Sequence, residues 1–278
     1  MKLPLYHVDA FTSRVFAGNP AAVVPLEGWL DDGTLQAIAA ENNLSETAYL
    51  VGGRGRYHIR WMTPITEVDL CGHATLASAW VVLNVLEPGR NVVTFDSKSG
   101  PLVVTREGDL LALDFPSRPP EPATAALPAL AEALGRAPRE AWAARDYMAV
   151  FDSAVEVQAL RPDMARVAAL DRFALIVTAP GHGVDFVSRF FAPAEGIPED
   201  PVTGSAHCTL VPYWARRLGK ARLTARQVSA RGGELECEDL GERVRIAGRA
   251  VKFLEGNVFI ESGGAAPHPL KPPLAPPK

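Results

Sequence analysis

Two stretches of the chain, about 130 residues apart, repeat the same order of features. "IRWMTP", which begins at Ile59, aligns with "SRFFAP", which begins at Ser188, an offset of 129 residues. Gly72 of "CGHATLASAW" aligns with Gly204 of "TGSAHCTLVPYW", an offset of 132 residues, so the two offsets differ by only three residues of loop. In each copy an aromatic strand, a proline, an acidic loop and a helix start rich in small residues follow one another. Such a repeat constrains the fold strongly because each copy must form the same unit.

The repeat predicts two similar α/β domains related by a pseudo-twofold axis. We expect an N-terminal domain over residues 1–117 and a C-terminal domain over residues 128–262, because the intervening "SRPPEPATAALPAL" has few large apolar residues. The tail over residues 263–278 is rich in proline and alanine and is expected to be poorly ordered. With 278 residues, 47% of them hydrophobic and 22% charged, the chain is long enough for two globular domains.

Hydrophobic periodicity predicts a helix at the end of each repeated stretch. One helix is expected from about Ala74 to Leu86 and the other from about Ala206 to Leu218, closed by Gly219. A further helix is expected from about Asp31 to Asn42, and short strands account for most of the remaining apolar runs. A pseudo-twofold axis would point the two helix N-termini at one interdomain cleft, where their unpaired N–H groups favour an anion.

Charge and cysteine usage limit the classes of partner and compartment. A net charge of −4 and the absence of a basic stripe argue against a nucleic-acid partner. No apolar run approaches the ~20 residues of a membrane helix, and "MKLPLYHVDAF" lacks the pattern of a secretory signal. Three cysteines are too few for a disulfide framework. We therefore expect a cytoplasmic protein with reduced thiols and no membrane partner.

Cysteine and histidine near both helix starts raise two further hypotheses. Cys71, His73, His207 and Cys208 are residue types that bind zinc, but the C-x-H and adjacent H-C spacings are unlike those of zinc sites, so we predict no metal. Because a helix N-terminus lowers the pKa of a thiol, Cys71 as a nucleophile stays open. No Walker or dinucleotide-binding fingerprint is present.

Four separated motifs resemble one known family in their order. "VDAFTSRVFAGNPAAVV", "NNLSETAYL", "LCGHATLASAW" and "EDPVTGSAHCTL" are similar to the phenazine-biosynthesis PhzF-like isomerases, relatives of diaminopimelate epimerase. The resemblance extends from about Tyr6 to Ile260. It implies an α/β fold of two pseudo-symmetric domains, each a mixed sheet curled around a central helix, in a homodimer that uses no cofactor and no metal. This fold agrees with the repeat found in the sequence.

The resemblance also implies catalytic roles for three residues. The general acid/base of the family falls on Glu46 in "SET", the assisting histidine on His73, and the aspartate that opens "DPVTGS" on Asp200. At the first turn of a helix, His73 is expected to be a neutral imidazole. The expected substrate contacts are Asn19, Ser45, Cys71, Gly72, Ala74, Thr203, Gly204 and Ser205.

One departure from the epimerase relatives narrows the chemistry. Those relatives use two cysteines, one at each helix start, whereas here Cys71 is opposed by Thr203, whose hydroxyl cannot replace a thiolate as a base. We therefore predict cofactor-free proton transfer by Glu46 on a small carboxylated metabolite. Two alternatives stay open: a non-catalytic binding or interaction protein of the same fold, and a racemase or epimerase that uses Cys71.

Overall fold

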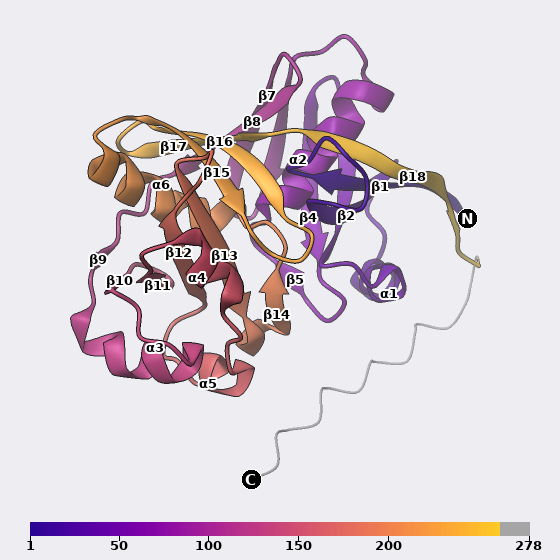
Figure 1. Ribbon diagram of the computed structural model, residues 1–278. Helices are drawn as coiled ribbons and strands as arrows, with labels where there is room; N and C mark the ends of the chain where they lie inside the picture. The colour runs from indigo at the N-terminus through magenta and orange to yellow at the C-terminus, as the bar shows by residue number, and fades with distance from the viewer. Residues whose placement is uncertain (262–278) are drawn as a thin grey trace.

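The computed structural model describes residues 1–261, and the predicted tail over residues 263–278 lies outside these residues. Within them, 18 strands form one continuous mixed sheet that curls around two central helices (Figure 1). The elements of the first half are β1 (Lys2–Ala10), β2 (Asn19–Leu26), α1 (Asp32–Asn42), β3 (Glu46–Gly53), β4 (Arg56–Met62), β5 (Glu67–Val68), α2 (Gly72–Val81), the π-helical turn η1 (Val82–Leu86), β6 (Val92–Ser97), β7 (Gly100–Glu107) and β8 (Leu110–Pro116).

The second half follows a short linker. Its elements are β9 (Glu121–Pro122), the 3-10 turn η2 (Thr124–Ala126), α3 (Leu127–Leu134), β10 (Glu140–Ala143), β11 (Tyr147–Val150), α4 (Ala154–Ala159), α5 (Met164–Ala168), β12 (Leu175–Pro180), β13 (Phe186–Ala192), the 3-10 turn η3 (Pro193–Glu195), β14 (Ile197–Asp200), α6 (Gly204–Leu218), β15 (Arg222–Gln227), β16 (Gly233–Asp239), β17 (Arg243–Gly248) and β18 (Ala250–Phe259).

The pairing of the strands confirms the repeat. In the first half β2 and β3 are parallel, β3 and β4 antiparallel, β4 and β6 parallel, and β6, β7 and β8 form antiparallel pairs. The second half has the same order in β11, β12, β13, β15, β16 and β17. The helix α2 lies between β5 and β6 in sequence, as α6 lies between β14 and β15. The α/β fold class with two repeated units is therefore confirmed.

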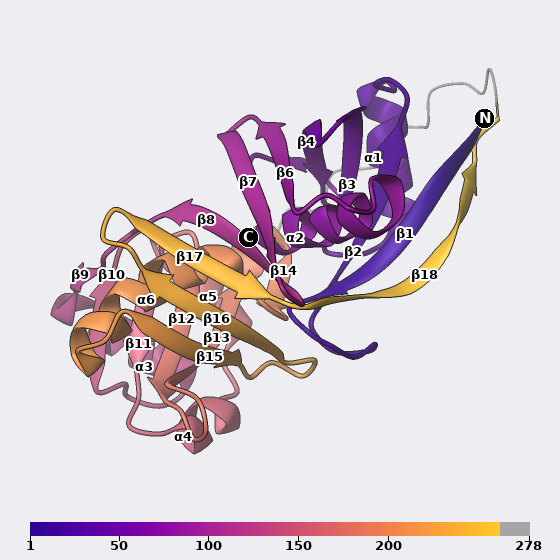
Figure 2. The ribbon, with the colours of Figure 1, turned by 90° about the horizontal axis from the view of Figure 1, so that it is seen from above.

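Two strand pairings connect the halves. β8 pairs antiparallel with its counterpart β17, and β1 pairs along its whole length with β18, the last strand of the chain. Figure 2 shows β1 and β18 side by side as a long ribbon beside α2. The proposed domains, 1–117 and 128–262, are therefore not separate in their hydrogen bonding: β18 completes the sheet of the first half although it belongs to the C-terminal range.

The two central helices begin earlier than the sequence predicts. α2 begins at Gly72 rather than Ala74 and ends at Val81, and α6 begins at Gly204 rather than Ala206. The residues that precede them, Cys71 and Thr203, have extended backbone and no side-chain capping bond, which leaves the first N–H groups of both helices without a local side-chain acceptor. Propensity could not locate these starts because glycine is a poor helix former.

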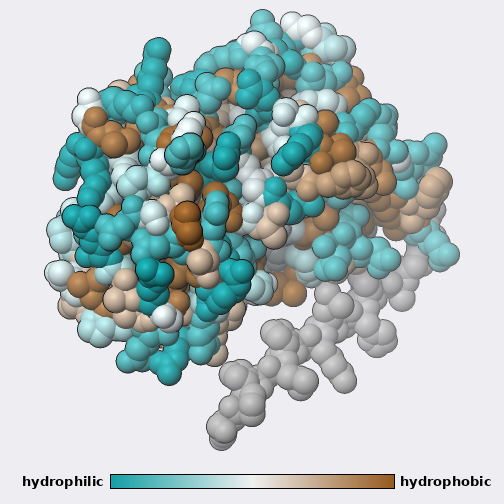
Figure 3. All heavy atoms as spheres, in the orientation of Figure 1, coloured by the Kyte–Doolittle hydropathy of each residue, from teal (hydrophilic) through white to brown (hydrophobic). Residues whose placement is uncertain are grey.

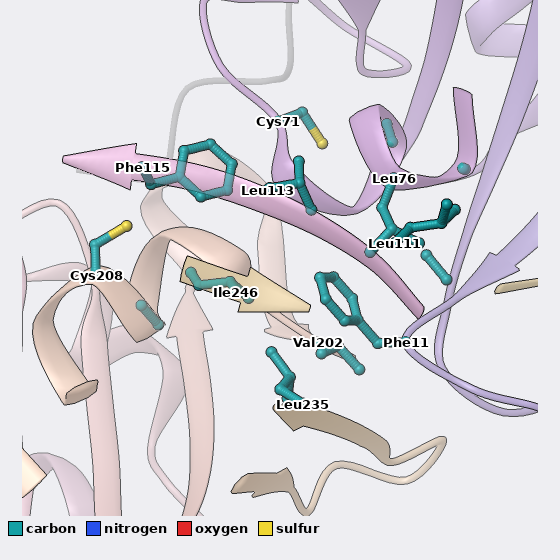
Figure 4. Packing of buried hydrophobic residues seen from close by; sticks show 14 of the residues in the cluster. Phe11, Cys71, Leu76, Leu111, Leu113, Phe115, Val202, Cys208, Leu235 and Ile246 are labelled. Carbon is teal, nitrogen blue, oxygen red and sulfur yellow. The ribbon is translucent and has the colours of Figure 1, made fainter. Parts of the chain in front are cut away.

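The hydrophobic core is continuous between the halves. Leu113 and Phe115 on β8 lie between α2 on one side and Ile246 of β17 on the other (Figure 4), and all belong to one buried cluster. This packing holds the two helix starts in a fixed relation. On the surface, hydrophilic side chains cover most of the visible face, with apolar residues scattered in small groups (Figure 3). No helix within residues 1–261 is long and apolar enough to cross a membrane.

Candidate active site

The start of α2 meets the start of α6 at the centre of the molecule. A Cβ atom placed on Gly72 would lie 3.5 Å from the Cα atom of Gly204. The two helix starts therefore lie within van der Waals reach of each other. The parallel strands β2 and β3 begin at the same edge, with Ala21 opposite Glu46, and so bring Asn19 and Glu46 to this point. Residues from four elements converge where the two helix starts meet, and neither start has a side-chain cap.

Glu46 and His73 form a buried pair. The Oε2 atom of Glu46 lies 3.1 Å from the Nε2 atom of His73, and the two side chains are only 9% and 5% exposed. These two atoms are close enough for an ion pair but are not aligned for a hydrogen bond, and neither has another hydrogen-bond partner within residues 1–261. The carboxylate of Glu46 therefore has an oxygen that is free to take a proton.

The other ring nitrogen of His73 contacts the opposite side of the cluster. Its Nδ1 atom lies 3.5 Å from the sulfur of Cys71 and 3.1 Å from the amide nitrogen of Asn19. Burial lowers the pKa of His73, but the neighbouring Cys71 and Glu46 raise it by a larger amount. The pKa of His73 therefore lies well above its usual value. The expectation of a neutral imidazole from the helix dipole is wrong, because a carboxylate in direct contact outweighs a partial charge.

Asp200 lies at the end of β14 and is held by two donors. The amide nitrogen of Asn19 donates to its Oδ1 atom over 2.8 Å, and the hydroxyl of Thr203 donates to its Oδ2 atom. Burial raises the pKa of Asp200 to about 6, with Glu46 acting in the same direction and His73 opposing it. Asn19 also donates to the carbonyl oxygen of Val202 over 2.9 Å. Asn19 thereby ties β2 in the first half to the start of α6 in the second.

Gln227 was missed by the sequence analysis, although it fixes the second helix start. Its amide nitrogen donates to the carbonyl oxygen of Asp200 over 2.7 Å and to the hydroxyl of Thr203 over 3.1 Å, and its Oε1 atom accepts from the N–H of Thr203 over 2.9 Å. The sequence held a signal for it. In "RLTARQ" the inward positions are Leu223, Ala225 and Gln227, so a polar side chain occupies a core position and needs a partner.

Cys71 does not have the environment of a reactive thiol. Burial and the nearby Glu46 carboxylate raise its pKa to about 11, although its position at a helix start acts in the opposite direction. At neutral pH the group is a thiol. The nucleophile hypothesis therefore loses its physical support, because the thiolate is the nucleophilic form.

The remaining predicted residues lie near the cluster without joining it. Ser205 accepts a hydrogen bond over 3.3 Å from Arg145, a residue that the sequence analysis also missed and that pairs with the buried Asp146. Ala74 is buried in the first turn of α2, and Ser45 is half-buried directly before Glu46.

The four-residue zinc hypothesis fails on position. His207 donates from Nδ1 to the carbonyl oxygen of Thr203 over 2.8 Å, and the Cys208 thiol lies 3.8 Å from the carbonyl oxygen of Gly204, so both face their own helix. Within the described part of the chain, the potential ligand atoms that lie within 4.8 Å of one another belong instead to Glu46, Cys71 and His73.

Comparison with known proteins identifies the family. The family model of phenazine biosynthesis-like proteins, PhzC-PhzF, matches residues 8–256. An uncharacterized isomerase of Pseudomonas aeruginosa is 54% identical over 94% of this chain and 100% of its own length. The chain belongs to the PhzF family. The human phenazine biosynthesis-like domain-containing protein is 38% identical over 93% of this chain and 99% of its own length, so the PhzF family extends to mammals.

Solved structures agree with this assignment. A PhzF-family protein of Enterococcus faecalis is 48% identical, covers 94% of this chain and 100% of its own, and has a TM-score of 0.91. A predicted epimerase of Pseudomonas aeruginosa, 19% identical with a TM-score of 0.72, and a probable proline racemase of Agrobacterium radiobacter, 12% identical with a TM-score of 0.62, share the fold. The epimerase-like fold is therefore confirmed, while the role of each site residue in this member of the PhzF family stays a prediction.

Proposed function

We propose that this PhzF-like isomerase moves a proton within a small carboxylated metabolite, with Glu46 as the general acid and base. The observation that carries the proposal is the buried Glu46 carboxylate, whose Oε2 atom has no hydrogen-bond partner within residues 1–261 and lies 3.1 Å from His73. A carboxylate that is buried and paired with a cation can take a proton from carbon, exchange it with solvent while it is held, and deliver a proton back to carbon.

The reaction occurs between the two helix starts. Glu46 removes a proton from a carbon next to a carboxylate or carbonyl group, and the electron pair moves into the conjugated system of the substrate. The first N–H groups of α2 and α6, which lack side-chain caps, stabilise the negative charge that develops there. Glu46 then returns the proton to a different carbon of the same molecule. Because the proton donor and acceptor are one side chain, the step requires no cofactor.

His73 and Asp200 support this step from opposite sides. In its cationic form His73 pairs with the carboxylate of Glu46 and positions it for the substrate. Asp200, with its pKa raised to about 6, is partly protonated near neutral pH and donates or accepts a hydrogen bond at the substrate. As part of the proposal we retain the homodimer that the family resemblance implies and the cytoplasmic location expected from the sequence.

The two alternatives have weaker support. A racemase that uses Cys71 needs a second thiol, and Thr203 occupies that position with its hydroxyl bonded to Asp200. The raised pKa of Cys71 also removes the thiolate that such a mechanism requires. A binding protein without turnover would keep the same fold and the same helix starts, but it would not require a buried acid/base pair.

Hydrogen exchange into substrate carbon distinguishes an enzyme from a binding protein. We would incubate the protein in heavy water with a mixture of small unsaturated and hydroxylated carboxylic acids and detect deuterium at carbon by mass spectrometry and NMR. The proposal predicts incorporation in one compound class by the wild-type protein and its loss in Glu46→Gln. Incorporation that persists in Glu46→Gln would exclude Glu46 as the base. Binding without incorporation would favour the non-catalytic alternative.

A further inference from the structure

Glu46, Cys71 and His73 bring three kinds of metal-binding atom together. A carboxylate oxygen, a thiol sulfur and an imidazole nitrogen from these residues all lie within 4.8 Å of one another. The Oε2 atom of Glu46 and the Nε2 atom of His73 are 3.1 Å apart, close to the separation of two ligands on one tetrahedral zinc ion with bond lengths of about 2.0 Å. All three residues are buried.

The cluster also leaves polar atoms without partners. The Oε2 atom of Glu46, the Nε2 atom of His73 and the Oδ1 atom of Asn19 are each buried and have no hydrogen-bond partner within residues 1–261. Buried polar atoms are rarely left unsatisfied in folded proteins, so three of them in one cluster indicate that the site accepts a polar ligand or an ion.

The charges of the cluster favour a cation. The charges of His73 and Glu46 shift the pKa of the Asp200 carboxyl. The charges of the same two residues shift the pKa of the Cys71 thiol. Within residues 1–261, the carboxyl groups of Glu46 and Asp200 and the thiol of Cys71 thus lie around the imidazole of His73. A divalent cation bound to the Glu46 carboxylate and the Cys71 thiolate would neutralise both ligands within the buried site.

We infer that Glu46, Cys71 and His73 form a reversible binding site for a borderline-soft divalent cation such as Zn²⁺. A carboxylate, a thiolate and a neutral imidazole are the ligand types that Zn²⁺ takes, and three protein ligands leave a fourth position for water. On binding, the Cys71 thiol and the His73 imidazolium each lose a proton to the buffer, and a sulfur–metal and a nitrogen–metal bond form with no change of oxidation state. This site differs from the four-ligand set considered from the sequence, since Glu46 replaces His207 and Cys208.

Occupancy of this site would switch off proton transfer. Metal coordination takes up the carboxylate oxygen that Glu46 needs as a base, so catalysis and metal binding exclude one another. The inhibition rests on the proposed function, whereas metal binding does not. Zn²⁺ is thus an inhibitor of this protein, and removal of Zn²⁺ by a chelator restores activity.

Cobalt substitution tests the site without any measurement of turnover. Co²⁺ is added to the untagged chain and the absorption spectrum is recorded. Excess Zn²⁺ is then added to displace Co²⁺, which should remove the Co²⁺ bands. We expect one equivalent of Co²⁺ with a thiolate-to-metal charge-transfer band and the visible bands of a tetrahedral site. Cys71→Ser removes the charge-transfer band, and Glu46→Gln weakens binding by at least ~10-fold. Circular dichroism of each variant establishes that it is folded.

The two other buried cysteines provide matched controls. Cys208→Ser and Cys237→Ser remove a free thiol elsewhere in the core and should leave the charge-transfer band unchanged. A wild-type spectrum without a thiolate band at saturating Co²⁺ would overturn the inference, as would a band that persists in Cys71→Ser. Should Cys71→Ser fail to fold, unchanged affinity in Glu46→Gln would overturn it instead. If the protein binds Co²⁺ at this site but incorporates no deuterium into any compound, the proposed function is contradicted and the metal site is not.

Discussion

The starts of α2 and α6 occupy equivalent places in the repeat but carry different chemistry. At α2, Cys71 and His73 lie beside Glu46, and the polar atoms of this group are incompletely hydrogen-bonded. At α6, the hydroxyl and N–H of Thr203 and the side chain of Asp200 are all bonded to neighbours. A single repeated unit has thus produced one helix start with groups that can exchange protons and one with a fixed hydrogen-bonded frame.

This difference explains why two similar helix starts need not act as two bases. Both have extended N-cap residues without side-chain caps, so both can stabilise an anion through the backbone. Proton transfer additionally requires a side chain with a free, titratable atom near the substrate, and the α2 side supplies Glu46 and His73. Substitutions of Glu46 or His73 should therefore reduce activity, whereas substitutions of Thr203 or Gln227 should reduce mainly stability.

The largest expected effect is on activity at the α2 start. His73→Asn removes the positive partner of Glu46, and we expect deuterium incorporation to fall about 100-fold or more while the protein stays folded. Incorporation is measured by mass spectrometry on the compound found with the wild-type protein. His58→Asn, at an exposed position, is the matched control and should have no effect. An equal loss in both variants would contradict the role of His73.

Next in size is a stability effect at the α6 start. Gln227→Leu leaves the N–H of Thr203 and the carbonyl oxygen of Asp200 without partners, and we expect the free energy of unfolding to fall by about 2 kcal/mol. Urea denaturation measures this change. Gln36→Leu removes one bond, to the carbonyl oxygen of Thr63, at a less buried site and should cost about 1 kcal/mol or less. A Gln227 variant as stable as the wild type would refute the fixed frame.

The pKa of Asp200 predicts a smaller, pH-dependent effect. Because burial raises the pKa of Asp200 to about 6 in the folded state, the folded protein binds this proton more tightly than the unfolded chain. The contribution to stability is complete below the unfolded pKa near ~4 and is lost as the pH rises through about 6. Between pH 5 and 7 this loss amounts to about 1 kcal/mol. Asp200→Asn should lack this slope in denaturation experiments, and an identical slope in both proteins would contradict the raised pKa.

The smallest effect is expected from making the two starts alike. Thr203→Cys places a thiol opposite Cys71 but replaces the hydroxyl that donates to Asp200 with a weaker donor. We expect a loss of about 1 kcal/mol in the free energy of unfolding and no new racemisation, since a thiol buried there would share the raised pKa of Cys71. Chiral chromatography that detects racemised product would show that the two helix starts are interchangeable.

The sequence predicted the architecture well because each copy of the repeat and the hydrophobic pattern of each element can be recognised within a short stretch of sequence. α1 was expected from Asp31 to Asn42 and is found from Asp32 to Asn42, and both central helices were found, although each begins two residues earlier than expected. The pairing of β1 with β18 could not be predicted, because it joins residues about 250 positions apart and no local pattern records such a partner.

The candidate site was predictable in its residues but not in its electrostatics. Glu46, His73, Asp200 and Asn19 could be named from motifs, and the structure brings them together. The raised pKa of His73 and the role of Gln227 depend on which side chains meet in space. A helix dipole can be inferred from sequence, whereas a carboxylate 3.1 Å away from a ring nitrogen requires coordinates.

The central claim is that Glu46, and not Cys71, moves the proton. The most direct test compares the initial rates of deuterium incorporation of Glu46→Gln and Cys71→Ser with the wild type, on the same compound and at the same pH. The account predicts a loss of about 100-fold or more in Glu46→Gln and less than about 10-fold in Cys71→Ser. A rate that survives in Glu46→Gln and disappears in Cys71→Ser would contradict it.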